Sequence, residues 1–183
     1  MDFPIYKLPP PPVLTPFCIE SLGLFTPVAT LSPLGSIAST AWPTNNLAFF
    51  YPFRLYDWAT AYQLLFWVGA TSSGNIDVGI YDSQLNLIVG AGSTAMSATV
   101  NTVQELNIAD TILPPGDYLL GVVCSTTAGT VFGSITADEN ILSSVPVYEQ
   151  ASALPLPNPC VPVMATGVNP FRAACGIQFR SIF

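Results

Sequence analysis

Apolar and polar residues alternate along most of the chain after residue 35. The segment NIDVGIY, residues 75–81, places Ile76, Val78 and Ile80 on one face of an extended strand. This period of two is typical of a half-buried β-strand. The segments AYQLLFWV, residues 61–68, and DYLLGVVC, residues 117–124, keep the period but carry apolar residues on both faces. Such strands predict a sandwich whose outer face is also partly covered.

Further strands are predicted at residues 47–54, 85–91, 103–108, 131–136 and 177–183. Short turn sequences separate the strands, namely SSGN, DSQLN, PPGD and TTAG, and this close spacing of turn residues is typical of all-β folds. No segment has a convincing amphipathic helical pattern, although residues 135–144 have room for one or two turns. We therefore predict an all-β domain over residues 35–183, a two-sheet antiparallel sandwich of jelly-roll type.

A proline-rich arm is predicted to precede this domain, over residues 1–34. Its run of consecutive prolines favours an extended polyproline II conformation without internal hydrogen bonds. Apolar residues flank the prolines, whereas a disordered linker would be polar, so we expect the arm to lie on its own domain or on another subunit. The predicted contact residues are Phe3, Ile5, Tyr6, Leu8, Pro9, Pro10, Pro11 and Pro12.

A second proline-rich stretch covers about residues 145–170. Its prolines exclude a long central strand, because proline cannot donate a hydrogen bond to a neighbouring strand. We expect a long surface excursion that decorates a site or contacts a neighbouring molecule.

The sequence LPPGDY, residues 113–118, predicts a tight turn between two strands. Pro115 fixes its own φ, and Gly116 is expected to supply a positive φ. Tyr118 is expected to enter the next strand, with its ring in the core and its hydroxyl near a backbone group. We assign these three residues to the fold and not to catalysis.

The segment GAGSTA, residues 90–95, has the glycine spacing of a dinucleotide-binding loop. Such a loop needs a helix N-terminus directly after it to hold the phosphates. The residues that follow, MSATVNTVQEL, are rich in β-branched and cap-forming side chains, which disfavour a helix. We therefore assign the glycines to a bulge or a close backbone contact within a strand, and we predict no cofactor.

Few residues carry a charge. Only 8% are Asp, Glu, Lys or Arg, against about 25% in an ordinary globular domain. The surface is therefore expected to be uncharged and polar, to be buried against neighbours, or both. The net charge of -7 with four basic residues argues against nucleic-acid binding. No apolar run reaches the length of a membrane span, and no secretory signal pattern occurs at the start, so we expect synthesis in the cytoplasm.

The sequence contains few residues or motifs that are typical of a catalytic site. It contains no histidine, the commonest general base, and no motif of a serine hydrolase, a phosphate-binding loop or a zinc protease. Its four cysteines are widely spaced, which favours free buried thiols over a zinc site, with a Cys160–Cys175 disulfide as an alternative. Calcium binding by Asp77, Asp82 or residues 138–140 stays open, although no calcium-loop spacing occurs. We predict no catalytic residue and no metal site.

Three phrases follow one another between Ala41 and Ser125: AWPTNNLAFFYPFRL, then SGNIDVGIYD with its hairpin, and then LPPGDYLL. This order resembles a family of β-sandwich structural proteins from tailed bacteriophages. Carbohydrate-binding-module-like and jelly-roll domains share the last phrase. The resemblance covers somewhat under half of the chain and leaves out the arm and the residues after Asp138. It implies a virion component.

The resemblance and the low charge together predict a non-enzymatic phage virion protein, above all a capsid decoration (cement) protein made in the host cytoplasm. We expect a homo-oligomer, with a trimer suggested by the resemblance, that binds other virion proteins such as the major capsid protein. The alternative is a receptor- or glycan-binding module at a phage head or tail surface, with Trp58 beside Asp57 as the platform. A glycosidase is a third alternative, because carboxylates are present.

Overall fold

The structure of the protein is a computed structural model, which describes residues 18–19, 24–25, 38–134, 146–151, 153–165 and 171–181. These residues form strands and connecting loops without a helix. Accordingly, no helix long and apolar enough to cross a membrane occurs in the described part of the chain. The predicted all-β fold is confirmed.

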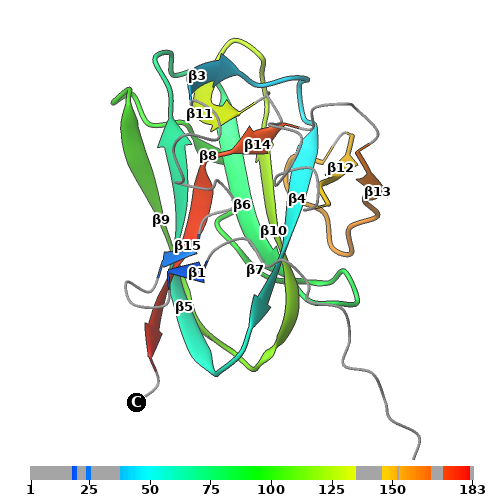
Figure 1. Ribbon diagram of the computed structural model, residues 1–183. Helices are drawn as coiled ribbons and strands as arrows, with labels where there is room; N and C mark the ends of the chain where they lie inside the picture. The colour runs from blue at the N-terminus through cyan, green and yellow to red at the C-terminus, as the bar shows by residue number, and fades with distance from the viewer. Residues whose placement is uncertain are drawn as a thin grey trace, which may run out of the picture.

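The strands form two antiparallel sheets that face each other as a sandwich (Figure 1). Sheet A has the order β1 (Cys18–Ile19), β2 (Leu24–Phe25), β15 (Cys175–Ser181), β5 (Ala59–Val68), β11 (Thr130–Ser134) and β14 (Arg172–Ala173), with β9 (Thr102–Leu113) paired to β5 and β3 (Ala38–Ala41) to β11. Sheet B has the order β13 (Val163–Met164), β12 (Tyr148–Gln150), β4 (Ala48–Leu55), β10 (Gly116–Cys124), β6 (Asn75–Tyr81) and β7 (Leu87–Gly90), with β8 (Thr94–Ala95) paired to β6.

The strands predicted from the period of two are all present. β6 has the predicted bounds, and the other seven begin and end within a few residues of the predicted limits, except that β9 continues to Leu113. The strands that were not predicted are short: β1, β2, β3, β8, β12, β13 and β14 contain two to four residues each. Segments of this length are too short to show an alternating pattern.

The main core lies between the two sheets. Ile76, Val78 and Ile80 of β6 pack in one cluster with Leu64 and Phe66 of β5, and all five side chains are fully buried. Burial of one such side chain stabilises the fold by roughly 1.5–3 kcal/mol. The alternation in NIDVGIY therefore marks the face of β6 that points into the sandwich.

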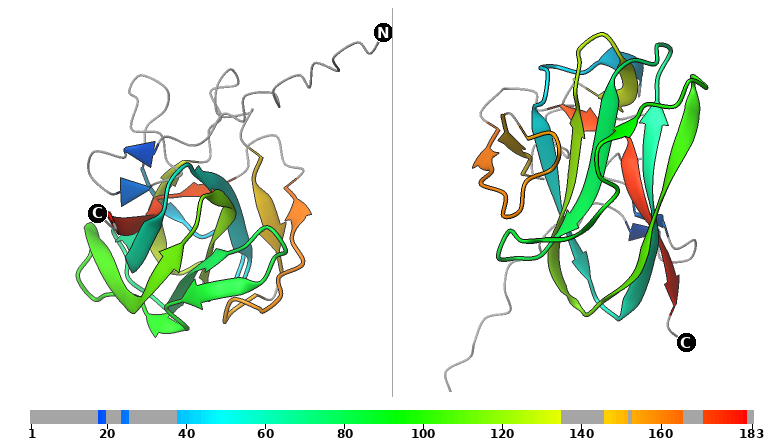
Figure 2. Two further views of the ribbon diagram at one scale, coloured as in Figure 1. Left: turned by 90° about the horizontal axis from the view of Figure 1, so that it is seen from below. Right: turned by 180° about the vertical axis from the view of Figure 1, so that it is seen from behind.

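The outer face of sheet B is covered by the excursion, residues 146–165. Phe50, Tyr81 and Val123 belong to a second buried cluster together with Leu156 and Cys160 of the excursion. Figure 2 shows this segment, in orange, beside the strands of sheet B. β4 and β10 are thus apolar on both faces because one face meets the core and the other meets the chain's own excursion.

The turn before β10 forms where it was predicted, but with a different role for its glycine. Tyr118 is buried, and its hydroxyl donates a hydrogen bond to the carbonyl oxygen of Pro114 at 2.6 Å. Pro114 and Pro115 occupy the exposed corner between β9 and β10. The expected positive φ at Gly116 is wrong: Gly116 is the first residue of β10, and its φ lies outside the left-handed region. The proline pair and the tyrosine define this corner.

The glycine-rich segment after β7 leads into strand β8 and not into a helix. Gly92 has a φ of +72°, and the amide of Ala91 donates to the carbonyl oxygen of Val78 at 2.9 Å. Upstream, residues 82–86 form the predicted hairpin turn, in which Leu85 has a φ of +69°. Gly90 pairs with Gly79 of β6, whereas an added Cβ on Gly92 would meet nothing within 4 Å, so Gly92 supplies a positive φ and not the expected close backbone contact.

The range predicted as an arm contributes two short strands to the sandwich. β1 and β2 pair with each other, and Phe25 and Leu24 of β2 pair with Ile177 and Gln178 of β15. This places the β1–β2 hairpin at the edge of sheet A. The predicted contact residues from Phe3 to Pro12 lie outside the described residues.

Candidate functional site

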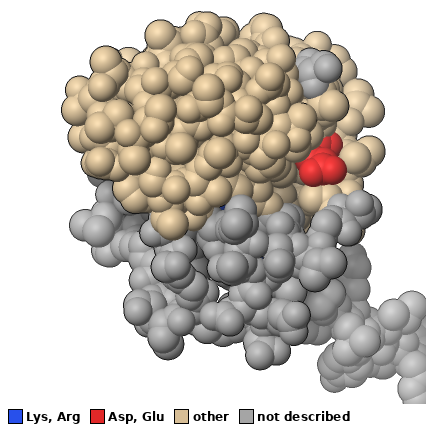
Figure 3. All heavy atoms as spheres, turned by 90° about the horizontal axis from the view of Figure 1, so that it is seen from above, with Lys and Arg blue, Asp and Glu red and all other residues tan. Residues whose placement is uncertain are grey.

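The described loops at one end of the sandwich contain no Asp, Glu, Lys or Arg. Residues 38–47, 69–76, 91–104 and 125–134 contain no Asp, Glu, Lys or Arg. These residues include the loops from β3 to β4, from β5 to β6 and from β10 to β11, and the chain around β8, which lie at the same end (Figure 1). Seen from this end, the described surface shows uncharged residues apart from one small acidic group at its rim (Figure 3). We call this end the charge-free pole.

Hydroxyl groups tie the loops of the charge-free pole to one another. Thr130 Oγ1 accepts hydrogen bonds from Ser39 Oγ at 2.9 Å and from the amide of Thr71 at 2.8 Å. Ser39 Oγ in turn accepts from the amide of Ala70 at 2.7 Å. Three segments distant in the sequence are thereby fixed at one point.

Amide and hydroxyl side chains fix the neighbouring loops in the same way. Asn45 Oδ1 accepts from the amide of Thr127 at 2.7 Å, and Ser125 Oγ accepts from the amide of Asn75 at 2.8 Å. The pole is therefore a preorganised polar surface, because its polar side chains are used to hold loop backbones in place. Its exposed side chains include Thr99, Val100, Thr127 and Ala128.

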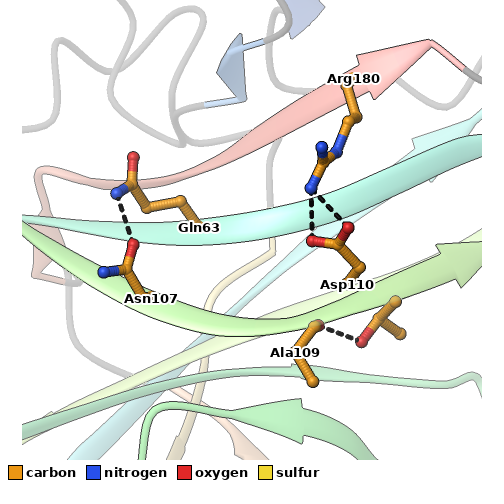
Figure 4. Close-up of polar contacts among 6 residues, drawn as sticks. Gln63, Asn107, Ala109, Asp110 and Arg180 are labelled. Carbon is orange, nitrogen blue, oxygen red and sulfur yellow. Dashed lines mark hydrogen bonds and ion pairs between the residues drawn. The ribbon is translucent and has the colours of Figure 1, made fainter.

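Ion pairs gather at the opposite end of the sandwich. Arg54 at the end of β4 forms a bidentate pair with Asp117 at the start of β10. The hydrogen bond from Arg54 lowers the pKa of the Asp117 carboxyl. Arg180 of β15 donates to both carboxylate oxygens of Asp110 (Figure 4) and lies 4.9 Å from the centre of the Tyr62 ring. These side chains make this end a charged pole.

The predicted glycan platform lies at the charged pole. Trp58 is 50% exposed, as is expected of a loop residue, and Tyr56 on the other side of Asp57 is 66% exposed. Asp57 Oδ1 accepts a hydrogen bond from the amide of Trp58 at 2.7 Å, which fixes the turn. Trp42 is fully buried and donates to the carbonyl oxygen of Leu47. Trp58 and Tyr56 thus form the exposed aromatic pair.

Polar side chains on the paired strands β5 and β9 form hydrogen bonds with one another. Gln63 donates through Nε2 to Asn107 Oδ1 at 2.9 Å, as Figure 4 shows, and to Glu105 Oε2 at 3.2 Å. Gln63 itself is only 9% exposed. This group stabilises the pairing of β5 with β9, since each bond crosses from one strand to the other.

A buried carboxylate lies beneath the excursion. Asp77 of β6 is 2% exposed, and its Oδ2 accepts a hydrogen bond from the amide of Leu156 at 3.0 Å. Oδ1 has no hydrogen-bond partner among the described residues. Burial raises the pKa of this carboxyl, against the opposing effect of the backbone amides around it. Asp77 and the hydroxyl of Tyr81, which donates to the carbonyl oxygen of Pro157 at 2.8 Å, hold the excursion on sheet B.

The residues considered for calcium do not come together. Asp77 is enclosed, and Asp82 Oδ1 instead accepts from the amides of Gln84 and Asn86, each at 2.9 Å, in the β6–β7 turn. Residues 138–140 lie outside the described residues. No cluster of three or more His, Cys, Asp or Glu side chains able to hold a metal occurs in the described ranges.

Cys124, Cys160 and Cys175 are free and buried. Cys124 and Cys175 belong to the main core, whereas Cys160 belongs to the cluster beneath the excursion. Burial raises the pKa of the Cys160 thiol to about 11. The alternative of a Cys160–Cys175 disulfide is therefore wrong: Cys175 lies on β15 of sheet A and faces the main core, whereas Cys160 lies on the outer side of sheet B.

An exposed apolar strip runs along the edge of sheet B. Val161, Val163 and Met164 are 71%, 62% and 59% exposed. Val163 and Met164 form β13, the last strand of this sheet, which pairs with β12 through Glu149 and Tyr148. We call these three residues the edge strip. The sequence showed the excursion but not which of its residues stay exposed.

No protein-family model matches the chain, and searches of curated proteins and of solved structures find no significant match. The functional argument therefore depends on the two poles and the edge strip.

Proposed function

We propose that the protein is a non-enzymatic structural subunit whose copies associate through the charge-free pole. The segregation of charge carries this proposal: four chain segments without an ionisable residue meet at one end, while the ion pairs lie at the other. Burial of an uncharged surface avoids the desolvation of charges, and the cores of stable interfaces are depleted of Lys, Glu and Asp.

The hydrogen bonds among the pole loops support the proposal further. Ser39, Thr71 and Thr130 are bonded to one another or to loop amides before any partner binds. A partner that docks on a preorganised surface loses less conformational entropy than one that must order flexible loops. This favours a stable contact between subunits.

The resemblance to phage β-sandwich proteins suggests the kind of assembly. We propose a virion component, above all a capsid decoration protein, whose partners are further copies and other virion proteins such as the major capsid protein. Such a role needs binding alone.

The test is to place charge on the pole. Thr99→Asp combined with Thr127→Asp is expected to convert an oligomer into a monomer in size-exclusion chromatography with light scattering, since two charges would have to be desolvated on association. The matched control, Ser83→Asp with Ala109→Asp, adds the same charge at exposed positions away from the pole. A monomeric unmodified protein, or an equal effect of both variants, would contradict the proposal.

A glycan-binding role is the second candidate, and the exposed Trp58–Tyr56 pair favours it. Aromatic rings with a neighbouring carboxylate are a surface on which sugar rings stack. Titration of neutral oligosaccharides should then change the tryptophan fluorescence, and Trp58→Ala should abolish the change while the fold is retained. An unchanged spectrum at millimolar saccharide would argue against this role.

A further inference from the structure

The edge strip is an apolar strand edge with no partner strand on its outer side among the described residues. β13 is the terminal strand of sheet B and pairs only with β12 in the described structure. Exposed apolar edge strands invite pairing with another segment, and proteins usually protect them with charges, prolines, bulges, short strand length or a covering element. The strip, Val161-Pro162-Val163-Met164, carries no charge, so its protection is limited to Pro162 and to the two-residue length of β13. An extended apolar segment is therefore the kind of partner that fits it.

The chain contains such a segment in residues 3–14, FPIYKLPPPPVL. Phe3, Ile5, Tyr6 and Leu8 supply apolar side chains, and the prolines that follow favour an extended backbone. A segment whose sequence favours an extended backbone loses less conformational entropy when it docks than a flexible one. The composition of the segment thus matches the strip in polarity and in backbone shape.

Charge provides a second match between the two surfaces. Lys7 is the single lysine of the chain and lies among these apolar residues. Glu149 of β12 stands opposite Val163 in the register of the sheet, directly beside the strip. Glu149 takes part in neither of the ion pairs Arg54–Asp117 and Arg180–Asp110. A lysine docked with the segment would meet a carboxylate there.

The described strands next to the segment and the edge strip lie on different sheets. The chain joins the sandwich through β1 and β2 at the edge of sheet A, whereas the strip forms an edge of sheet B. A segment attached to one sheet and an edge strip on the other sheet belong to different surfaces of the molecule. A contact between two different surfaces is heterologous, and it closes into a ring when the rotation between subunits allows it.

We propose that residues 3–14 of one copy dock on the edge strip of a neighbouring copy, with Lys7 beside Glu149. The inference deepens the proposed structural function and rests on it, since it names the segment that links the subunits. The link is additional to the contact at the charge-free pole.

A carbodiimide cross-link tests this on the full chain. The reagent joins a lysine amine to a carboxylate as an amide with loss of water, which the carbodiimide takes up as it becomes a urea. Equal amounts of 14N- and 15N-labelled protein are mixed, allowed to exchange and cross-linked. Mass spectrometry of the digest is expected to show Lys7 joined to Glu149, with about half of the linked peptides carrying one label of each kind. Lys7→Arg and Glu149→Gln should each abolish the product.

A variant of the full chain with an altered edge strip completes the test. The triple change Val161→Thr, Val163→Thr, Met164→Thr should reduce the mixed-label product at least tenfold, while Ile112→Thr, at another exposed apolar residue, should leave it unchanged. Linked peptides with one label only would mean docking within one copy and would overturn the inference, as would links from Lys7 to other carboxylates at equal yield. If the protein is oligomeric but forms no Lys7–Glu149 cross-link, the docking inference is wrong while the proposed structural function stands. A monomeric protein refutes the proposed function as well.

Discussion

Tyr51 connects the two sheets by its hydroxyl group, and its replacement by Phe is expected to weaken the sandwich. Tyr51 belongs to β4 of sheet B and is 1% exposed. Its hydroxyl donates to the carbonyl oxygen of Phe171 at 3.2 Å and accepts from the amide of Ala173 at 2.9 Å, both next to or within β14 of sheet A. Burial raises the pKa of this phenol well above its usual value, so the hydroxyl keeps its proton.

The size of the expected stability loss follows from the two backbone groups that lose the Tyr51 hydroxyl as hydrogen-bond partner. Tyr51→Phe keeps the ring in place but leaves a buried amide without an acceptor and a buried carbonyl with one bond fewer. An orphaned buried donor costs about 1–3 kcal/mol, and the weaker second bond adds about 1 kcal/mol. We therefore expect a loss of about 3 kcal/mol, which lowers the melting temperature of a chain of this size by about 9 °C.

The measurement is urea unfolding followed by circular dichroism, with Tyr118→Phe as the matched control. The Tyr118 hydroxyl also donates to a carbonyl oxygen, that of Pro114, but at an exposed corner where water can replace it. We expect the control to lose less than about 1 kcal/mol. If the two variants lose the same stability, or if Tyr51→Phe loses less than about 0.5 kcal/mol, the hydroxyl does not link the sheets in the way described.

Two further predictions concern single residues. Burial raises the pKa of Asp77 in the folded state, so its contribution to stability is complete below the unfolded pKa of about 3.9 and is lost as the pH rises through the folded pKa. Asp77→Asn should remove this decline from urea-unfolding curves recorded between pH 4 and 7; an unchanged decline would show that another group causes it. Gly116→Ala should leave the melting temperature unchanged or raise it slightly. The φ of Gly116 is ordinary, and an added Cβ would lie 3.6 Å from the Tyr118 ring. A fall of several degrees in the melting temperature would show that the backbone is strained at Gly116.

The long strands could be predicted from the sequence because burial imposes the pattern directly. Ile76, Val78 and Ile80 had to be apolar to face the core, and β6 was predicted with its observed bounds. The short strands β12 and β13 could not, since their pairing depends on where the excursion meets sheet B and not on local periodicity. The role of Gly116 was misjudged because the Pro-Gly pattern matches a turn whose glycine has a positive φ, while here the bend falls one residue earlier.

The exposure of Trp58 could be predicted from its position in a loop, whereas the charge-free pole could not. Its segments are separated by strands along the chain, and only the topology brings them to one end. A signal was available, because the predicted loops at 69–74 and 125–129 contain Ser, Thr, Gly and Ala without a charge. That signal becomes informative only when the strand directions show that both loops lie at the same end.

The low charge of the chain has two separate physical causes, and only one of them concerns partners. Phe50, Tyr81 and Val123 would form an apolar outer surface on sheet B, but Leu156 and Cys160 of the same chain bury them. These apolar residues are therefore buried without a second molecule. The edge strip and the charge-free pole remain outside that cover, and they differ in chemistry: the strip is apolar, and the pole is a bonded layer of hydroxyl and amide groups. An assembly that uses both would combine an apolar contact, which weakens on cooling, with a polar one that depends on fixed geometry.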